Sequence, residues 1–209
     1  MKQDERHIKT DLAIAGTGIA GVAAAIFALQ EGISVALTGN TGALAYTTGY
    51  LDLLGIDLGR GSAEIQNPWR GIEALRSTEP RHPLSRVTED DIKRSFTIFT
   101  EYITDCGLGY TAPVSMNLDA LSPVGTVKKT LCVPRTMLEG VKAFNARKKC
   151  LIIDFTGLRG FSGRQIAANL SQSWPELRHT RMDFPLITQK EIYPEVAART
   201  LEVEAHRAL

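Results

Sequence analysis

The sequence has few cysteines, and they do not form a metal-binding pattern. Cys106, Cys132 and Cys150 lie far apart and lack the Cys-x-x-Cys spacing common to iron–sulfur clusters and structural zinc sites. The four histidines show no metal-ligand spacing either. An odd number of cysteines without an export signal is typical of a reduced cytosolic setting. We therefore expect no metal centre in this chain.

The chain also lacks an excess of charge of either sign. Its 24 Lys and Arg residues are balanced by 23 Asp and Glu residues, which gives a formal net charge of +1. The basic groups at 128–129 and 147–149 are short and are expected to be solvated. Such a balance does not favour a polyanionic partner, so we expect no binding to nucleic acid.

Long hydrophobic runs are almost absent. The segment Leu12–Leu29 is uncharged and just long enough to span a bilayer. Three glycines cluster near its start, alanine is only weakly hydrophobic, and the acidic residues Asp4 and Glu5 precede it. A signal peptide would instead begin with a basic region free of acids. We expect neither membrane insertion nor export.

The same segment carries the most informative pattern in the chain. Leu12 to Ala15 predict a buried strand that runs directly into Gly16-x-Gly18-x-x-Gly21. An alanine-rich helix follows to about Gln30, and Ile33 to Leu37 predict a second strand. In this order the glycines allow a tight turn, and free N–H groups at the helix start are directed at a phosphate. The alternative is a Rossmann-like unit whose glycines serve packing only.

One expected residue is missing from this pattern. Dinucleotide-binding folds place an Asp or Glu after the second strand, about 20 residues past the first glycine, to bind the adenosine ribose. That position falls near Thr38, and no acid occurs between Glu31 and Asp52. FMN has no adenosine, so we expect FMN, with FAD as the alternative. The candidate cofactor-binding residues are Gly16, Thr17, Gly18, Ile19, Ala20, Gly21, Thr38, Thr47, Thr48 and Gly49.

Periodicity and turn signals predict the remaining elements. Strands are expected at 114–118, 125–133, 150–155 and 177–184, and helices at 68–77, 88–106, 165–172 and 194–209. The first two of these strands predict an antiparallel hairpin. The fold class is therefore α/β. We expect residues 1–107 to form a Rossmann-like FAD/NAD(P)-binding βαβ core with a parallel sheet, and residues 108–209 to form a smaller, mixed α+β cap or substrate part that contains the hairpin. The last helix has no stop signal, so this second part is expected to be incomplete and the chain truncated.

Five segments occur in a fixed order along the chain: GTGIAG (16–21), TTGYLDLLG (47–55), HPLS (82–85), SPVGTVKKT (122–130) and LIIDFTGL (151–158). In this order they resemble one family, the B-type subunits of anaerobic glycerol-3-phosphate dehydrogenase. The second and fourth segments are the most telling, because generic flavoproteins lack them. The resemblance runs from about residue 10 to the end and covers the N-terminal half of such a subunit.

The resemblance implies a membrane-associated complex of three subunits that oxidises glycerol 3-phosphate to dihydroxyacetone phosphate. Its implied partners are an FAD-bearing dehydrogenase subunit and an iron–sulfur subunit, which anchors the complex to the cytoplasmic side of the inner membrane and passes electrons toward quinone. The B-type subunit is itself implied to be a flavoprotein that binds FMN. Catalytic residues stay unknown, because His82 and Arg135, which lie in matching segments, are expected to be structural.

The resemblance also implies that this chain alone is inactive. Related flavoproteins complete the flavin site with a C-terminal segment, and the sequence stops before any such segment. Two other functions remain open at this stage. One is a truncated, non-catalytic Rossmann-like scaffold, and the other is a stand-alone FAD-dependent oxidoreductase.

Overall fold

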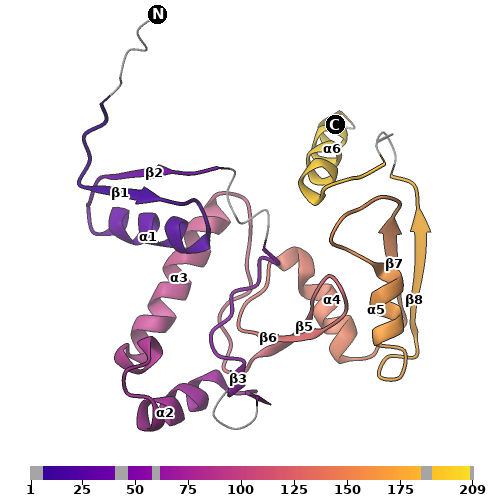
Figure 1. The fold of residues 1–209 in the computed structure, drawn as a ribbon, viewed down its shortest axis with the longest axis horizontal. Coiled ribbons are helices and arrows are strands. Elements are labelled where there is room, and N and C mark those ends of the chain that lie inside the picture. Colours follow the sequence, from indigo (N-terminus) through magenta and orange to yellow (C-terminus); the bar gives the residue numbers. More distant parts are fainter. Residues whose placement is uncertain (1–6, 41–46, 58–61, 185–189, 208–209) are drawn as a thin grey trace, which may run out of the picture.

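A computed structural model describes residues 7–40, 47–57, 62–184 and 190–207 and shows an α/β fold (Figure 1). Within these residues the strands form four separate sheets of two strands each. The elements in chain order are β1 (Leu12–Ala15), α1 (Ile19–Gln30), β2 (Val35–Thr38), β3 (Ile56–Asp57), β4 (Ala63–Glu64), α2 (Pro68–Thr78), the 3₁₀ helix η3 (Pro83–Arg86), α3 (Glu89–Asp105), β5 (Leu118–Leu121), β6 (Val127–Thr130), α4 (Arg135–Asn145), β7 (Cys150–Phe155), α5 (Gly163–Asn169), β8 (Leu177–Met182) and α6 (Pro194–Arg207).

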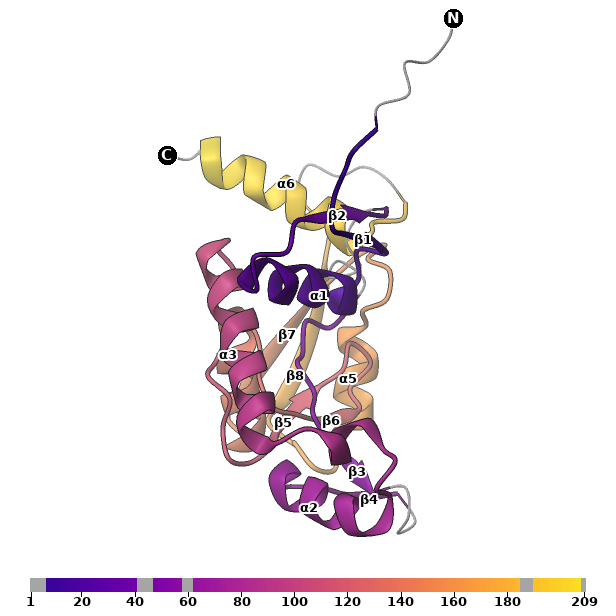
Figure 2. The same ribbon diagram turned by 90° about the vertical axis from the view of Figure 1, so that its left-hand side faces the viewer.

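The first strand, turn, helix and second strand occur in the predicted order. β1 and β2 pair in parallel, with Leu12 opposite Val35 and Ala15 opposite Thr38. Figures 1 and 2 both show α1 lying between this pair and α3. A wider Rossmann-type sheet stays a prediction, because β1 and β2 are the only strands of their sheet within the described ranges.

A second strand–helix–strand unit lies on the other side of the molecule in Figure 1. β7 and β8 pair in parallel from Cys150 opposite Leu177 to Phe155 opposite Met182, and α5 packs against both strands. The structure places both strands and the helix close to their predicted positions. The face away from α5 is open, since Leu151 and Ile153 are about half exposed (56% and 48%).

The largest core cluster joins the two halves of the sequence. Ile26 of α1 and Phe99 of α3 pack with Leu51 and Leu131, and all four are at least 92% buried. Leu51 also forms an isolated antiparallel bridge with Cys132. This core holds the segment after residue 47 against α1, which positions it for the site described below.

Local signals explain why α3 begins at the predicted position. Thr88 and Asp91 form a reciprocal capping box: the Thr88 hydroxyl accepts from the Asp91 amide at 3.1 Å, and the Asp91 carboxylate accepts from the Thr88 amide at 3.2 Å. The hydrogen bonds that the Thr88 hydroxyl (2.6 Å) and the Thr88 amide donate to the Asp91 carboxylate hold the pKa of this exposed carboxyl below its usual value. The apolar spacing from Ile92 to Ile103 then buries one side of the helix.

Two parts of the fold differ from the prediction. The first strand of the hairpin is Leu118–Leu121 rather than 114–118. The backbone N–H of Asn117 donates to the Gln66 carbonyl (2.7 Å), so the strand begins only after this residue. Helix α4 is absent from the sequence-based prediction, in which Pro134 only ends a strand. Pro134 instead stands at the N-cap of α4, where the missing N–H of proline costs little.

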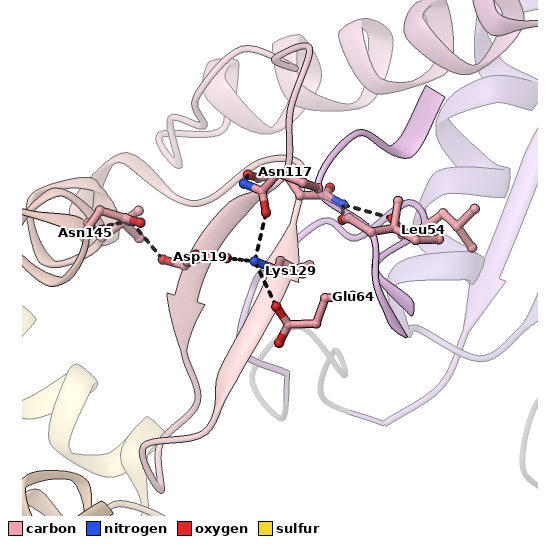
Figure 3. Close-up of polar contacts among 9 residues, drawn as sticks. Leu54, Glu64, Asn117, Asp119, Lys129 and Asn145 are labelled. Carbon is pink, nitrogen blue, oxygen red and sulfur yellow. Dashed lines mark hydrogen bonds and ion pairs between the residues drawn. The ribbon is translucent and has the colours of Figure 1, made fainter. Parts of the chain in front are cut away.

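A polar cluster fastens the β3–β4 hairpin to the β5–β6 hairpin (Figure 3). The Asn117 side-chain amide donates to the carbonyls of Leu54 (2.9 Å) and Ile65 (2.8 Å). The Lys129 ammonium contacts Asp119 on the neighbouring strand and lies 3.2 Å from a Glu64 carboxylate oxygen. The Asn117 side chain thus supplies donors to two part-buried carbonyl groups, and Lys129 pairs with two carboxylates.

We predict that Asn117→Ala lowers the free energy of unfolding by about 1–3 kcal/mol, because it leaves two carbonyls without their donor in a 97% buried position. Asn145→Ala is the matched control. Its amide also donates to two carbonyls, those of Asp119 and Val141, but Asn145 is exposed. Urea unfolding of both variants measures the difference. Equal losses would contradict the importance of burial at Asn117.

Candidate functional site

The turn between β1 and α1 is closed by backbone contacts. Gly16 has a φ of +116°, a conformation that L side chains rarely adopt, and its amide donates to the Thr38 carbonyl at 2.7 Å. The Thr17 hydroxyl donates to the Asn40 carbonyl. Thr17 is also so close to Gly39 that a Cβ there would lie 2.9 Å from the Thr17 amide nitrogen. The ends of β1 and β2 are therefore joined around the turn.

Gly21 controls how closely the helix approaches this turn. A Cβ built on Gly21 would lie 1.9 Å from the carbonyl oxygen of Gly16, which is far inside contact distance. Only glycine allows α1 to start in this position. The sequence pattern predicted this role for the third glycine.

The start of α1 leaves its first N–H groups free of partners within the described part of the chain. The N-cap is Gly18, which has no side chain to accept from them, and no acidic residue lies in the first turn. The first helical bond runs from the Val22 amide to the Gly18 carbonyl (2.9 Å), so the amides of Ile19, Ala20 and Gly21 donate to none of the described residues. Three free donors at the positive end of the helix dipole fit an anion such as a phosphate.

The segment Thr47–Gly49 contains two consecutive ST-turns, in which a threonine hydroxyl accepts from the backbone amide two residues further on. The Thr47 hydroxyl accepts from the Gly49 amide at 3.2 Å, and the Thr48 hydroxyl accepts from the Tyr50 amide at 3.3 Å. The Gly49 carbonyl accepts from the hydroxyl of Tyr110 at 2.8 Å. Gly49 has a φ of +71°, and a Cβ there would lie 3.2 Å from Pro134. This geometry requires glycine.

Of the candidate residues, the structure places Ile19 in the wall of a cavity beside α1, whereas Thr48 lines a different cavity, between α4, β7 and α5. Ile19 at the helix start and the residues from Tyr50 to Asp52 line one cavity of about 330 Å³, together with Phe96 and Phe99 of α3. Thr38 touches the turn through its backbone, while its side chain is exposed. Tyr110, which anchors Gly49 from 61 residues away, was missed because no local pattern marks such a contact.

The second strand–helix–strand unit provides an internal comparison. Its loop is also rich in glycine, and Gly157 and Gly160 have positive φ values. Here, however, two of the first three N–H groups of α5, those of Gly163 and Gln165, already have side-chain acceptors. The Asp154 carboxylate accepts from Gly163 (3.2 Å), and the Ser162 hydroxyl accepts from Gln165 (3.2 Å). The start of α1 therefore fits an anion better than the start of α5 does.

The two polar residues in matching segments take part in structural contacts. The His82 ring nitrogen Nδ1 accepts from the Leu84 amide at 3.2 Å and caps η3. The Arg135 side chain donates through Nε to the Tyr110 carbonyl at 3.2 Å. Neither contact identifies a proton-transfer residue. Across the described ranges, no group of three or more His, Cys, Asp or Glu side chains is placed to hold a metal ion.

Comparison with known proteins gives a consistent picture. Residues 11–207 match the FAD binding domain family. Proteins named as the B-type subunit of anaerobic glycerol-3-phosphate dehydrogenase are similar to this chain. The one from Vibrio cholerae is 31% identical over 82% of this chain and 39% of its own length. The one from Yersinia enterocolitica is 26% identical over 86% of this chain and 43% of its own length. The one from Aliivibrio fischeri is 25% identical over 78% of this chain and 36% of its own length.

The chain thus spans about two fifths of the length of the curated relatives that it matches. No solved structure matches it. None of the helices in the described ranges has the length and apolar character needed to cross a membrane.

We predict that Gly21→Ala destabilises the fold by about 1–3 kcal/mol, because the new methyl group would overlap the Gly16 carbonyl and force α1 away from β1. The matched control is Gly140→Ala in the interior of α4, where no atom lies within 4 Å of the added Cβ. This control is expected to gain about 0.5–1 kcal/mol from helix propensity. Thermal and urea unfolding measure both effects, and a neutral Gly21→Ala would contradict the close approach.

Proposed function

The chain belongs to the FAD binding domain family, and from this premise we propose that it forms the flavin-phosphate site of a subunit of anaerobic glycerol-3-phosphate dehydrogenase. The observation that carries the proposal is the row of amides from Ile19 to Gly21 at the start of α1, which have no acceptor among the described residues. The names of the relatives supply the substrate of the proposed reaction.

The residues at the turn fit a flavin in three ways. The amides of Ile19, Ala20 and Gly21 would hold the phosphate, and no side chain at Gly16 or Gly18 would compete for that space. Segment Thr47–Gly49 would line the ribityl chain or the phosphate end, held in place by Tyr110. When bound, the flavin supplies the redox chemistry, and the protein binds and orients it.

The family match favours FAD, whereas the missing acid near Thr38 favoured FMN. The FMN expectation therefore has no support from the comparisons. We propose FAD as the cofactor to test first. In that case the adenosine ribose would be bound without a carboxylate at the end of β2, because Thr38 offers only a hydroxyl and a carbonyl that already accepts from Gly16.

The relatives' names support a subunit of an anaerobic glycerol-3-phosphate dehydrogenase, whereas the partners, the electron acceptor and the location proposed next rest on the sequence resemblance. We propose that the subunit passes electrons from glycerol 3-phosphate oxidation toward an iron–sulfur partner and quinone, beside an FAD-bearing dehydrogenase subunit. The complex would lie at the cytoplasmic face of the membrane and be held there by a partner. The division into a flavin part, 1–107, and a cap part, 108–209, is proposed with it.

Flavin uptake by the purified chain tests the proposal. We expect protein incubated with FAD, then freed of unbound ligand, to keep the two-banded visible absorption of an oxidised flavin. Parallel samples with FMN and with riboflavin rank the ligands, and riboflavin is expected to be lost because it has no phosphate. A folded but colourless protein in all three samples would favour a non-catalytic scaffold instead.

We further predict that Gly18→Val weakens flavin binding by at least about tenfold, because a branched side chain would stand at the phosphate position. Ala24→Val is the matched control. It adds the same side chain to the exposed side of α1, one turn beyond the free amides. Fluorescence titration with FAD measures both variants. Equal affinities in the two would place the phosphate elsewhere.

A further inference from the structure

A second cavity, of about 340 Å³, lies between α4, β7, α5 and the turn of the β5–β6 hairpin. Its walls are mostly apolar and include three aromatic rings. The larger side chains that line it are those of Tyr50, Met137, Ile152, Phe161, Ile166 and Trp174. Its volume falls at the lower end of the range seen for small-molecule sites, about 300–1,000 Å³.

Among the described residues that line the cavity, none has a charged side chain. Its polar side-chain groups are the hydroxyls of Thr48, Tyr50, Ser122 and Thr136, the thiol of Cys150 and the indole N–H of Trp174, which donates to the Lys148 carbonyl (2.8 Å). Tyr50 donates to the Leu121 carbonyl (2.8 Å), and Ser122 shares a hydrogen bond with Thr126 (2.7 Å). Within the described residues, the Thr136 hydroxyl makes no hydrogen bond. Placing a phosphate or carboxylate here would bury a charge without a partner, which is strongly unfavourable.

A glycine in the interior of α4 borders this cavity. Gly140 is not among the glycines with positive φ, so the helix backbone does not require it. A Cβ at this position would meet no atom within 4 Å, so packing does not require glycine either. Glycine in a helix interior costs about 0.5–1 kcal/mol relative to alanine. Gly140 borders the open space of the cavity together with Thr136 and Met137, and the absence of nearby atoms leaves room there for a small side chain.

From these observations we propose that the cavity binds a small, uncharged aromatic molecule with one hydrogen-bonding group. The ring packs among Tyr50, Phe161 and Trp174, and Met137 supplies a soft contact at the opening. The hydrogen-bonding group meets the Thr136 hydroxyl. The site differs from the proposed flavin-phosphate site, since none of the residues from Gly16 to Gly21 lines it, although Thr48 belongs to both regions.

Trp174 reports on the cavity directly. The chain has two tryptophans, so Trp69→Phe leaves Trp174 as the only one. In this background we would titrate 4-nitroanisole, an uncharged quencher, and 4-nitrobenzoate, its charged counterpart. We expect saturable quenching by 4-nitroanisole and at least about tenfold weaker binding of 4-nitrobenzoate. Equal binding of the two probes would overturn the proposal, as would purely collisional quenching.

Paired substitutions at Gly140 test the opening. Gly140→Phe fills the space beside α4 and is expected to weaken 4-nitroanisole binding by at least about tenfold, whereas Gly140→Ala binds as the parent does. Because Gly140 is exposed, neither substitution replaces a buried residue. Circular dichroism checks that both variants fold. Equal affinity in Gly140→Phe and Gly140→Ala would contradict a site at this opening.

Alkylation of Cys150 gives a second, independent readout. In a Cys106→Ser background the remaining thiols are Cys150, which lines the cavity, and Cys132, which is fully buried. Burial raises the pKa of the Cys132 thiol to about 12, so Cys132 reacts slowly. Saturating 4-nitroanisole is expected to slow modification of Cys150 by N-ethylmaleimide at least about tenfold. An unchanged rate would overturn the proposal.

The Gly18→Val variant separates this proposal from that of flavin binding. The substitution lies at the start of α1 and does not alter the cavity lining. We expect Gly18→Val to bind 4-nitroanisole as the parent does even when it has lost flavin. Loss of both ligands in a folded Gly18→Val protein would show that the cavity is not a separate site.

Discussion

The close approach of Gly21 to the carbonyl oxygen of Gly16 is the constraint on which the site depends. A side chain at position 21 would start 1.9 Å from that oxygen, so α1 can follow β1 this tightly only with glycine there. Gly16 turns the chain at a φ of +116° and is held by the carbonyl at the end of β2. Together these contacts fix the start of the helix and leave its first amides without acceptors among the described residues.

Long-range contacts also hold the segment from Gly49 to Leu51 in place. The Tyr110 hydroxyl holds the Gly49 carbonyl, and the bridge between Leu51 and Cys132 holds the following residues against the core of α1 and α3. The polar cluster around Asn117 and Lys129 fastens the two antiparallel hairpins to each other. A flavin phosphate at α1 would therefore rest on a scaffold assembled from both halves of the sequence.

The sequence predicted those features that depend on local signals. The glycine pattern predicted β1, α1 and β2, and the capping box at Thr88 predicted the start of α3. Features that depend on distant partners were missed or shifted. The hairpin begins at Leu118 because Asn117 is bound to a segment more than 50 residues away, and nothing near Gly49 in the sequence indicates Tyr110. Helix α4 was missed because proline marks the start of a helix as well as its end. The cofactor residues themselves stay predictions.

Amide NMR of the chain during titration with FMN, FAD and riboflavin tests the central claim most directly. Flavin phosphate bound at the start of α1 predicts large shifts of the Ile19, Ala20 and Gly21 amide signals with FAD, and with FMN if it binds. Riboflavin, which has the same ring without the phosphate, should leave these signals in place. Binding of FAD with no change at these three amides, or the same change with riboflavin, would contradict the account.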